Sequence, residues 1–343
     1  MSEIKLVATG DVLLHGRVME LSRLNNKYDF KDKLAPAKKL LSSGDISVVN
    51  LEAIVAGEEM GLSSFPKFNN PIELAENLKE FGATIVTNAN NHSLDLGEKG
   101  ALKSIENIEK VGLTYVGSHK SKEDQETFRV IEENGIKCLF LAYTATSVGE
   151  KSPKGKEYLL NQIPKASARK IRQDIERAKK EIKPDVVIVS AHFGSEYSLM
   201  PASYQMELAR SISDSGADII LGSHPHVLQP AQWVINSRGK KTFVFYSLGN
   251  FYSGQKGLYR QIGGALNLNI RKDNRGKITI EKPTFDLTFV DAKKSKNFQM
   301  HLLREYIERN PYIKTEHDTF DSLEVYGDLS NRLTQWMPEL KVR

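Results

Sequence analysis

The stretch Ala217-Asp218-Ile219-Ile220-Leu221-Gly222-Ser223-His224-Pro225-His226 places two histidines directly after an apolar run. The run predicts a buried strand, so both imidazoles should lie on the turn that follows it. Histidines two positions apart point to the same side of an extended backbone, and the proline between them fixes one φ angle. The two rings could therefore converge on one metal centre, although a lone pair of this kind is more often a loop or packing feature.

Four more apolar runs end in polar residues that can bind metals. They are residues 6–11, 46–52, 84–92 and 186–192, which end in Asp11, Glu52, Asn90-Asn91-His92 and His192. In α/β sheets the carboxyl ends of the strands are where ligands bind. Oxygen and imidazole donors suit Mn, Fe, Zn or Mg rather than a thiolate-bound ion. The five strand ends together predict a site for one or two divalent metal ions, whose identity the donors leave open.

The order of apolar and amphipathic segments predicts the fold class. We expect strands near residues 4–9, 46–50, 84–88, 113–116, 137–142, 185–191, 218–222 and 242–247, and helices near 33–42, 71–81, 98–111, 165–182 and 203–216. This alternation indicates an α/β protein. Two alternating runs, 265–270 and 277–281, predict a hairpin, and the run 284–290 an added strand that completes the second sheet.

The last part of the chain predicts a different organisation. Residues 298–309 and 322–335 have helical patterns, with Pro311 between them. We therefore expect one α/β domain over residues 1–290 and a C-terminal helical extension over residues 291–343 that packs on the same domain. The extension could cover a cleft, form a dimer contact in a homo-oligomer, or simply add packing.

Six motifs, in this order and spacing, resemble those of the bacterial CapA-type capsule and poly-γ-glutamate synthesis proteins. They are Gly10-Asp11, Asn50-Leu51-Glu52, Asn90-Asn91-His92 with Asp95 and Gly97, His192-Phe193-Gly194 with Glu196-Tyr197, Gly222 to His226, and Ser247 to Phe251. The resemblance runs from about residue 6 to about residue 252. It implies a branch of the calcineurin-like metallophosphoesterases, which fold as a four-layer α/β/β/α sandwich with two facing mixed sheets and carry a two-metal site.

The resemblance also implies roles for individual residues. The implied metal ligands are Asp11 and His226 on one ion, Asn91, His192 and His224 on the other, and Glu52 bridging the two. His92 would be the general acid, with Asp95 placed to orient it. Two metals would lower the pKa of a bridging water and polarise a phosphoryl or carbonyl oxygen. The implied reaction is metal-dependent hydrolysis of a phosphoester, or of a γ-glutamyl or peptide-like amide.

Two positions depart from the metallophosphoesterase pattern. Leu13 stands two residues after Asp11, where those enzymes usually carry a histidine, and His15 could substitute for it. Glu52 stands in place of the usual aspartate and reaches one methylene further. Either one ion is held weakly or the site works with a single ion. The missing histidine favours a second hypothesis, a non-catalytic metal-bound scaffold or polymer-binding module that assists a synthase.

Each of these residues also has an ordinary structural explanation. Asp11 could be a turn residue, Glu52 a solvated carboxylate, and His192 a hydrogen-bonded core histidine. Asn91 fits a turn into a helix, which does not exclude metal binding. Only the joint pattern favours the functional interpretation.

The expected substrate contacts lie in the loops around these motifs. The candidates are Asn90, Glu196, Tyr197, Asn250 and Lys67. Asn250 could bind substrate or orient a metal-bound histidine. Tyr197 could instead have only a packing role. Lys67 could bind an anionic group or be an ordinary exposed lysine. Loops 53–70, 143–160 and 250–262 should form the pocket walls and decide the substrate.

Composition agrees with a soluble enzyme that acts on an anionic small molecule or polymer. The 343 residues are 40% hydrophobic and 27% charged, and the net charge is +5. The lysines are spread through helices without an aromatic-interleaved basic stripe, which favours a solvated surface over nucleic-acid binding. No apolar window is long enough to span a bilayer, and residues 1–5 lead straight into a strand, so we expect a cytoplasmic protein. The single Cys138 lies in a buried strand pattern, which excludes a disulfide framework and fits a reducing compartment.

Overall fold

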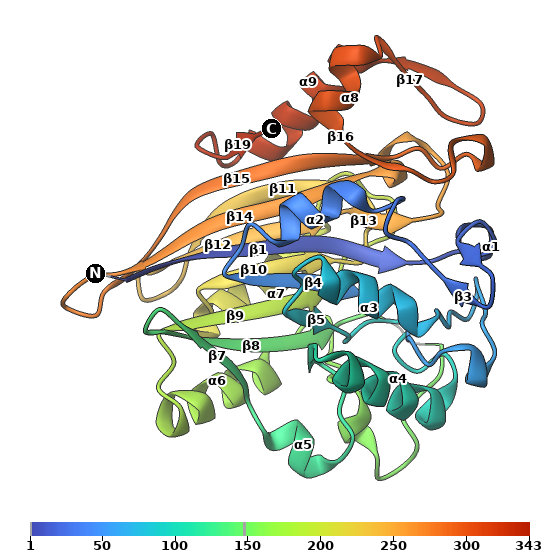
Figure 1. Ribbon diagram of the computed structural model, residues 1–343. Coiled ribbons are helices and arrows are strands. Elements are labelled where there is room, and N and C mark those ends of the chain that lie inside the picture. The colour runs from blue at the N-terminus through green and yellow to red at the C-terminus, as the bar shows by residue number, and fades with distance from the viewer. Residues whose placement is uncertain (1, 147–148) are drawn as a thin grey trace.

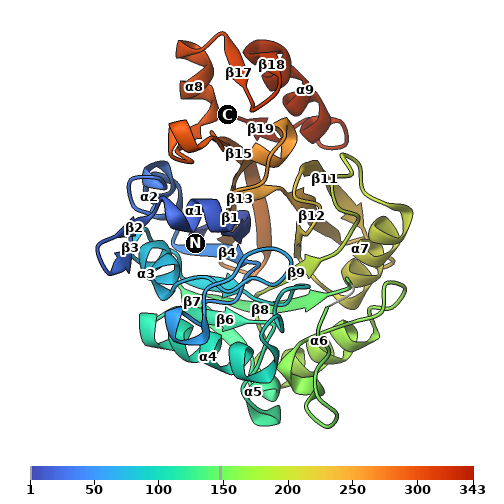
Figure 2. The same ribbon diagram turned by 90° about the vertical axis from the view of Figure 1, so that its right-hand side faces the viewer.

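Two facing β-sheets, each covered by helices on its outer side, form the body of the protein (Figures 1 and 2). The structure is a computed structural model and describes residues 2–146 and 149–343. Figure 2 shows α2, α3 and α4 on one side of the strands, and α6 and α7 on the other. The predicted four-layer α/β/β/α sandwich is confirmed.

The first sheet is mixed and has the strand order β16-β15-β14-β1-β4-β5-β6. Its strands are β1 (Ser2–Leu13), β4 (Ile46–Leu51), β5 (Ile85–Thr87), β6 (Thr114–Val116), β14 (Ile262–Lys272), β15 (Ile278–Val290) and β16 (Met300–Leu302). Strands β1, β4, β5 and β6 run parallel, so their carboxyl ends meet at one edge. Two short strands join beside this path, β13 (Asn250–Ser253) on β1 and β19 (Lys341–Val342) on β15.

The second sheet has the order β11-β12-β10-β9-β8-β7. Its strands are β7 (Arg129–Glu133), β8 (Ile136–Thr144), β9 (Val186–His192), β10 (Ile219–Ser223), β11 (Leu228–Ile235) and β12 (Lys241–Leu248). The four central strands are parallel, and β7 and β11 are antiparallel edge strands. The carboxyl ends of β9 and β10 therefore lie together, as those of β1 and β4 do.

Most of the helices follow the predicted amphipathic segments. The helices are α1 (Gly16–Glu20), α2 (Ala35–Leu41), α3 (Ile72–Glu80), α4 (Gly97–Val111), α5 (Lys122–Glu126), α6 (Arg169–Glu181), α7 (Ser203–Ser215), α8 (Leu303–Arg309) and α9 (Ser322–Thr334). The short α1 and α5 were not predicted. Two small hairpins lie outside the two sheets: β2 (Arg23–Leu24) with β3 (Lys27–Tyr28), and β17 (Tyr312–Lys314) with β18 (Thr319–Asp321). Among the described residues, no helix is long and apolar enough to cross a membrane.

Alternating side chains build three apolar layers. On β1, Leu6 and Ala8 face the second sheet, whereas Val7 faces the helices. On β8, Cys138 packs between the sheets and Leu139 packs under the helices of the second sheet. Because successive side chains on a strand point to opposite faces, each strand contributes to two layers at once. The strand backbones are held from both sides, and the loops that follow them start from fixed positions.

Several segments differ from the sequence prediction. The runs 277–281 and 284–290 form one long strand, β15, whose pairing with β14 shifts register between Asn267 and Asn269. This hairpin extends the first sheet, not the second, because β14 pairs with β1 from Ala265 to Lys272. Residues 300–302 are a strand instead of the start of a helix. The edge strands β7 and β11 and the short β13 were not predicted.

Residues after 290 contribute to the first sheet as well as forming helices. Strands β16 and β19 both pair with β15, and α9 contacts β11 of the second sheet. Together with α8 and the β17–β18 hairpin, these elements form the red region at the top of Figure 1. A boundary at residue 290 stays a prediction.

Candidate metal centre

Polar residues at four strand ends meet in one buried cluster. Asp11 lies near the end of β1, Glu52 follows β4, His192 ends β9, and His224 and His226 follow β10. The possible metal donors form two groups, Glu52 with His224 and His226, and Asp11 with Glu52 and His192. Within each group, the donor atoms all lie within 4.8 Å of one another. All five side chains are buried, and Glu52 belongs to both groups. The division of the ligands between two ions stays a prediction, but Glu52 has the central place that the resemblance gives it.

The Glu52 carboxylate, on the first sheet, contacts histidines of the second sheet. Its Oε1 atom lies 3.4 Å from His192 Nε2 and 3.5 Å from His226 Nε2. Both imidazoles come from the second sheet, whereas the carboxylate comes from the first. The extra methylene of glutamate therefore carries the carboxylate to histidines of the facing sheet.

Asp11 is fixed by its own sheet. Its Oδ1 accepts a hydrogen bond from Asn50 Nδ2 at 2.7 Å, and Asn50 Oδ1 accepts one from the Thr87 hydroxyl at 3.0 Å. The Asp11 amide donates to Gly249 O at 2.8 Å. This backbone contact needs the glycine before Asp11, because a Cβ atom at Gly10 would stand 1.9 Å from Gly249 O. Oδ1 is thus occupied, and Oδ2 is left to face the cluster.

His192 connects Asn91 to the cluster. Its Nε2 atom lies 2.7 Å from Asn91 Oδ1, and its Nδ1 atom lies 2.8 Å from the Ser223 hydroxyl oxygen. The serine contact fixes the ring plane and leaves Nε2 directed at Asn91 and Glu52. Asn91 Oδ1 thus lies beside the cluster, and its role as a metal ligand stays a prediction.

The His224-Pro225-His226 segment reaches the cluster by a different route from the one predicted. The backbone is not extended there: both histidines have positive φ angles, +98° for His224 and +59° for His226. Such angles are uncommon for residues other than glycine and cluster at functional sites. The extended-strand argument was wrong, and the two rings converge because the chain turns sharply on each side of the proline.

Asn250 orients His226. The Asn250 Oδ1 atom lies 2.9 Å from His226 Nδ1, which also lies 3.0 Å from Asp11 Oδ2. The Asn250 amide nitrogen donates to Gln255 Oε1 and to Arg260 O, each at 2.9 Å. Because every polar atom of this buried side chain has a partner, the geometry favours orientation of His226 over direct contact with substrate.

The electrostatics of the cluster fit a divalent cation. Asp11 Oδ2, both Glu52 carboxylate oxygens and His224 Nδ1 are buried and form no well-aligned hydrogen bond in the described part of the chain, although imidazole nitrogens lie 3.0 Å from Asp11 Oδ2 and 3.4 and 3.5 Å from Glu52 Oε1. Burial, reinforced by the Asp11 charge, raises the pKa of Glu52 well above its usual range. Burial and the neighbouring His226 lower the pKa of His224 to about 3. Imidazole nitrogens beside buried carboxylate oxygens are the donor set of a metal site, since a cation would offset the cost of burying the carboxylates.

His92 and Asp95 form a pair next to the cluster. The His92 Nδ1 atom lies 2.7 Å from Asp95 Oδ2. The ring packs edge-on against Phe68 with 4.7 Å between centroids, and the Phe68 amide donates to the same Asp95 oxygen at 2.6 Å. Residues 91–96 form turns before α4 begins at Gly97, so this pair is made by a turn instead of a helix.

Asn90 supports the same loop. Its amide nitrogen donates to Leu51 O at 2.9 Å, and its Oδ1 accepts the His92 amide hydrogen at 2.9 Å. The side chain is 1% exposed. This arrangement favours a positioning role for Asn90 over the predicted contact with substrate.

The unusual positions in the first motif have structural explanations. Leu13 is buried in a small apolar cluster with Ala53 and Phe68. His15 packs edge-on against Phe68 with 5.2 Å between centroids, and its Nδ1 accepts the Gly254 amide hydrogen at 3.3 Å. Neither donor group that the described residues form contains His15. The structure therefore gives no support to His15 as the replacement ligand.

The remaining candidates lie at the rim. Tyr197 is 46% exposed, and its ring lies 6.1 Å from that of His226. Glu196 is exposed, and its charge contributes to the raised pKa of Glu52 after burial and Asp11. Lys67 is exposed and forms an ion pair of 2.6 Å with Glu150. It lies outside the cluster, next to Phe68 in the loop that supports Asp95. Within the expected wall 143–160, residues 147–148 lie outside the described residues.

Sequence reasoning missed four supporting residues. Asn50 contacts Asp11, Ser223 contacts His192, and Phe68 contacts the His92–Asp95 pair. Arg260 stacks on Tyr197. The first two lie inside the recognised motifs, so their proximity to the ligands was a usable signal. Phe68 and Arg260 reach the centre through loops, and no local pattern indicates them.

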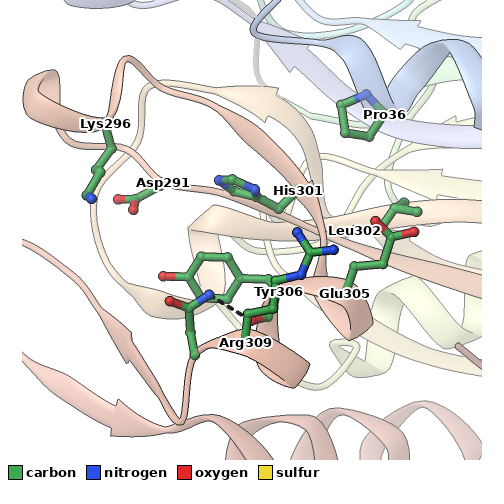
Figure 3. Close-up of a pocket in the computed structure, with 9 residues that line it drawn as sticks. Pro36, Asp291, Lys296, His301, Leu302, Glu305, Tyr306 and Arg309 are labelled. Atoms are coloured by element: carbon green, nitrogen blue, oxygen red, sulfur yellow. Dashed lines mark hydrogen bonds between the residues drawn. The ribbon is translucent and has the colours of Figure 1, made fainter.

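A separate hollow of about 350 Å³ lies away from this cluster (Figure 3). It is lined by residues of α2, β16, α8 and the segments beside them, including Asp291, His301, Tyr306 and Arg309. None of the proposed metal donors lines it.

Comparison with known proteins identifies similar sequences. The family described as "Bacterial capsule synthesis protein PGA_cap" matches residues 5–255. "Capsule biosynthesis protein CapA" of Bacillus anthracis is 30% identical over 269 residues, covering 74% of this chain and 60% of that protein. "PGA biosynthesis protein CapA" of Bacillus subtilis (strain 168) is 31% identical over 249 residues, covering 71% of this chain and 63% of that one. The match thus spans less than two thirds of the length of either relative.

The fold is similar to that of a solved metallophosphoesterase-like protein. The structure of Haemophilus influenzae NAD nucleotidase (NadN) superposes with a TM-score of 0.53 at 14% sequence identity. The similarity covers 99% of this chain and 57% of that one. At this identity the likeness concerns the fold alone.

Proposed function

This chain belongs to the bacterial capsule synthesis protein (PGA_cap) family, and from that premise we propose that it is a metal-dependent hydrolase. The reaction that we propose is cleavage of a phosphoester or of a γ-glutamyl or peptide-like amide, in capsule or poly-γ-glutamate biosynthesis. The observation that carries the proposal is the set of four buried donor atoms that form no hydrogen bond, on Asp11, Glu52 and His224, beside the oriented His92.

The chain's own residues divide the work. Asp11, Glu52, Asn91, His192, His224 and His226 would hold one or two divalent ions, with manganese the first candidate. Bound there, such ions lower the pKa of a water molecule and polarise the scissile group. Asp95 accepts the hydrogen bond from His92 Nδ1, which leaves Nε2 as the atom that exchanges a proton with the leaving group. Phe68 limits rotation of that ring.

The substrate that fits the rim is anionic. Lys67 and Tyr197 lie on loops around the centre, and Arg260 packs on the tyrosine ring. The names of the curated relatives support a link to capsule and poly-γ-glutamate synthesis, and a glutamate polymer carries one carboxylate per residue. A polymer substrate is consistent with a centre approached from an exposed rim.

The alternative is a non-catalytic metal-bound scaffold or polymer-binding module that assists a synthase. Leu13 favours it, because this buried residue stands where a metal-binding histidine would complete the usual site. The His92–Asp95 pair favours hydrolysis, because a scaffold has no need of an oriented proton donor.

One pair of measurements separates these functions. Metal content per chain is determined by elemental analysis on protein purified without chelator, with His224→Ala as the control. The same preparation is then assayed on model phosphoesters and γ-glutamyl amides, with and without chelator. Bound metal with chelator-sensitive hydrolysis supports the hydrolase. Tightly bound metal with no turnover of any substrate supports the scaffold, and an absence of bound metal contradicts both.

A further inference from the structure

The arginine at the rim of the centre has an aromatic partner and no acidic one. Arg260 lies on the turn Leu258–Gln261 between β13 and β14, just beyond the part of the chain that matches the family. Its guanidinium carbon lies 4.7 Å from the centre of the Tyr197 ring. Among the described residues it forms no ion pair with a carboxylate. A guanidinium kept in place without a counter-charge retains its donors for a ligand.

The stacked pair of Arg260 and Tyr197 lies between the protein surface and the buried centre. Tyr197 is 46% exposed, yet its ring lies 6.1 Å from the ring of His226, which is 2% exposed. Arg260 is tied to the same histidine through its backbone, because Asn250 donates to Arg260 O and accepts from His226 Nδ1. The three side chains thus form a continuous path from rim to cluster.

The backbone beneath Arg260 is shaped to fit its side chain. Gly257 has a φ of +96°, and a Cβ atom there would stand 2.8 Å from Nη2 and 3.2 Å from Nε of Arg260. The guanidinium therefore packs directly over bare backbone. At this positive φ any other residue would be strained, and its Cβ atom would push the guanidinium out of its present position.

The C-terminal residues hold this turn from outside. Lys256 forms an ion pair of 2.5 Å with Glu316 in the β17–β18 hairpin. The Tyr259 hydroxyl donates to Asp328 of α9 at 2.9 Å, and Arg332 of the same helix stacks on the Tyr259 ring. Contacts on both flanks of Arg260 reduce the freedom that its backbone would lose on binding a ligand.

We propose that Arg260, stacked on Tyr197, binds a second anionic group of the substrate, next to the bond that the metal centre cleaves. The inference rests on the proposed function, because it assumes that substrate reaches the centre past this rim. The planar guanidinium fork matches a carboxylate or a phosphate through two parallel hydrogen bonds. The group is either the α-carboxylate of a γ-glutamyl unit or a further phosphate, two sources with the same recognition chemistry.

Binding measured by calorimetry on the manganese-loaded protein tests this without turnover. The probes are a γ-linked triglutamate, which carries carboxylates alone, and inorganic pyrophosphate. Removing the two charge-assisted hydrogen bonds in Arg260→Gln should weaken the recognised probe by about 10- to 100-fold, with metal content and melting temperature unchanged. Arg309→Gln, in the separate hollow of Figure 3, is the matched control and should bind as the wild type does.

A second variant keeps the Arg260 side chain but displaces its guanidinium group. Gly257→Ala places a methyl group against the guanidinium, so binding should weaken although Arg260 is intact. Loss confined to triglutamate identifies a carboxylate as the recognised group, and loss confined to pyrophosphate identifies a phosphate. The inference is overturned if Arg260→Gln binds within twofold of the wild type, or if the wild type binds neither probe.

The two proposals fail in different ways. Arg260-dependent binding in a protein that hydrolyses no model substrate would contradict the hydrolase and leave the anion site standing. Chelator-sensitive hydrolysis, together with probe binding that is unchanged in Arg260→Gln, would support the hydrolase and contradict the anion site.

Discussion

The Nδ1 atom of His92 lies 2.7 Å from Oδ2 of Asp95, in a turn that Phe68 closes from the other side. This contact leaves the far ring nitrogen as the one available to a substrate. We expect His92→Asn to keep the metal and the fold and to lose turnover by about 10²- to 10⁴-fold, the usual contribution of a general acid. Activity and metal content measured on the same preparation check this.

Asp95→Asn should cost less, because the imidazole stays in place and loses only its orientation. His301→Asn, in the hollow of Figure 3, is the control and should be fully active. Full activity of His92→Asn would remove this residue from the mechanism.

Glu52 should make the stability of the metal-free protein fall with pH. Because burial and Asp11 raise its pKa in the folded state above the unfolded value, the folded protein binds this proton more tightly. The stabilisation is present below the unfolded pKa and is lost as the pH rises towards the folded pKa, by up to about 1.4 kcal/mol per pH unit. Urea unfolding in chelator between pH 5 and pH 8 measures it.

Glu52→Gln should flatten that slope and make the metal-free protein more stable at pH 8, while reducing the metal bound. Glu305→Gln, an exposed glutamate, is the control and should leave both unchanged. If Glu52→Gln destabilises the metal-free protein at pH 8, the carboxylate is compensated by a group other than a cation.

Gly10 and Gly16 should respond oppositely to the same substitution. A Cβ atom at Gly10 would collide with Gly249 O, whereas at Gly16 the nearest atom, Ser64 Cβ, lies 3.6 Å away. We expect Gly10→Ala to destabilise the fold by about 1–3 kcal/mol or more, as overpacking does. Gly16→Ala, at the start of α1, should be neutral or slightly stabilising. Thermal unfolding of both variants is the measurement, and equal melting temperatures would contradict the close approach of β1 to β13.

Cys138 should be unreactive in the folded protein. Burial raises the pKa of its thiol to about 12, so roughly one molecule in 10⁴ carries the thiolate at pH 8. A thiol reagent such as Ellman's reagent should label it within minutes in denaturant and hardly at all in buffer. Rapid labelling of the native protein would show that β8 opens locally.

The elements that could be predicted from sequence are those whose signal is local. Strand β9 ends at His192 as its apolar run indicates, and β1 and β4 end close to Asp11 and Glu52. Strand β13 could not be predicted, because four residues carry little pattern and their pairing with β1 depends on the glycine contact 239 residues away. Pairing of β14 with β1 is equally non-local, which is why the hairpin was given to the wrong sheet.

Parts of the site also lie beyond sequence reasoning. The left-handed backbone of His224 and His226 is imposed by the surrounding structure, since neither residue favours it alone. The contact of Arg260 with Tyr197 joins two loops with no shared motif. Asn50 and Ser223, by contrast, lie one or two positions from a predicted ligand and could be found by asking what holds each ligand in place.

The donors are divided between the sheets, Asp11 and Glu52 on one and His192, His224 and His226 on the other. Neither sheet by itself presents a complete set, so the centre can assemble only once the two have docked face to face. The amount of metal bound therefore reports whether the sheets are correctly docked. A core substitution that lets the two sheets shift relative to each other should weaken metal binding first, even when it lies far from every ligand.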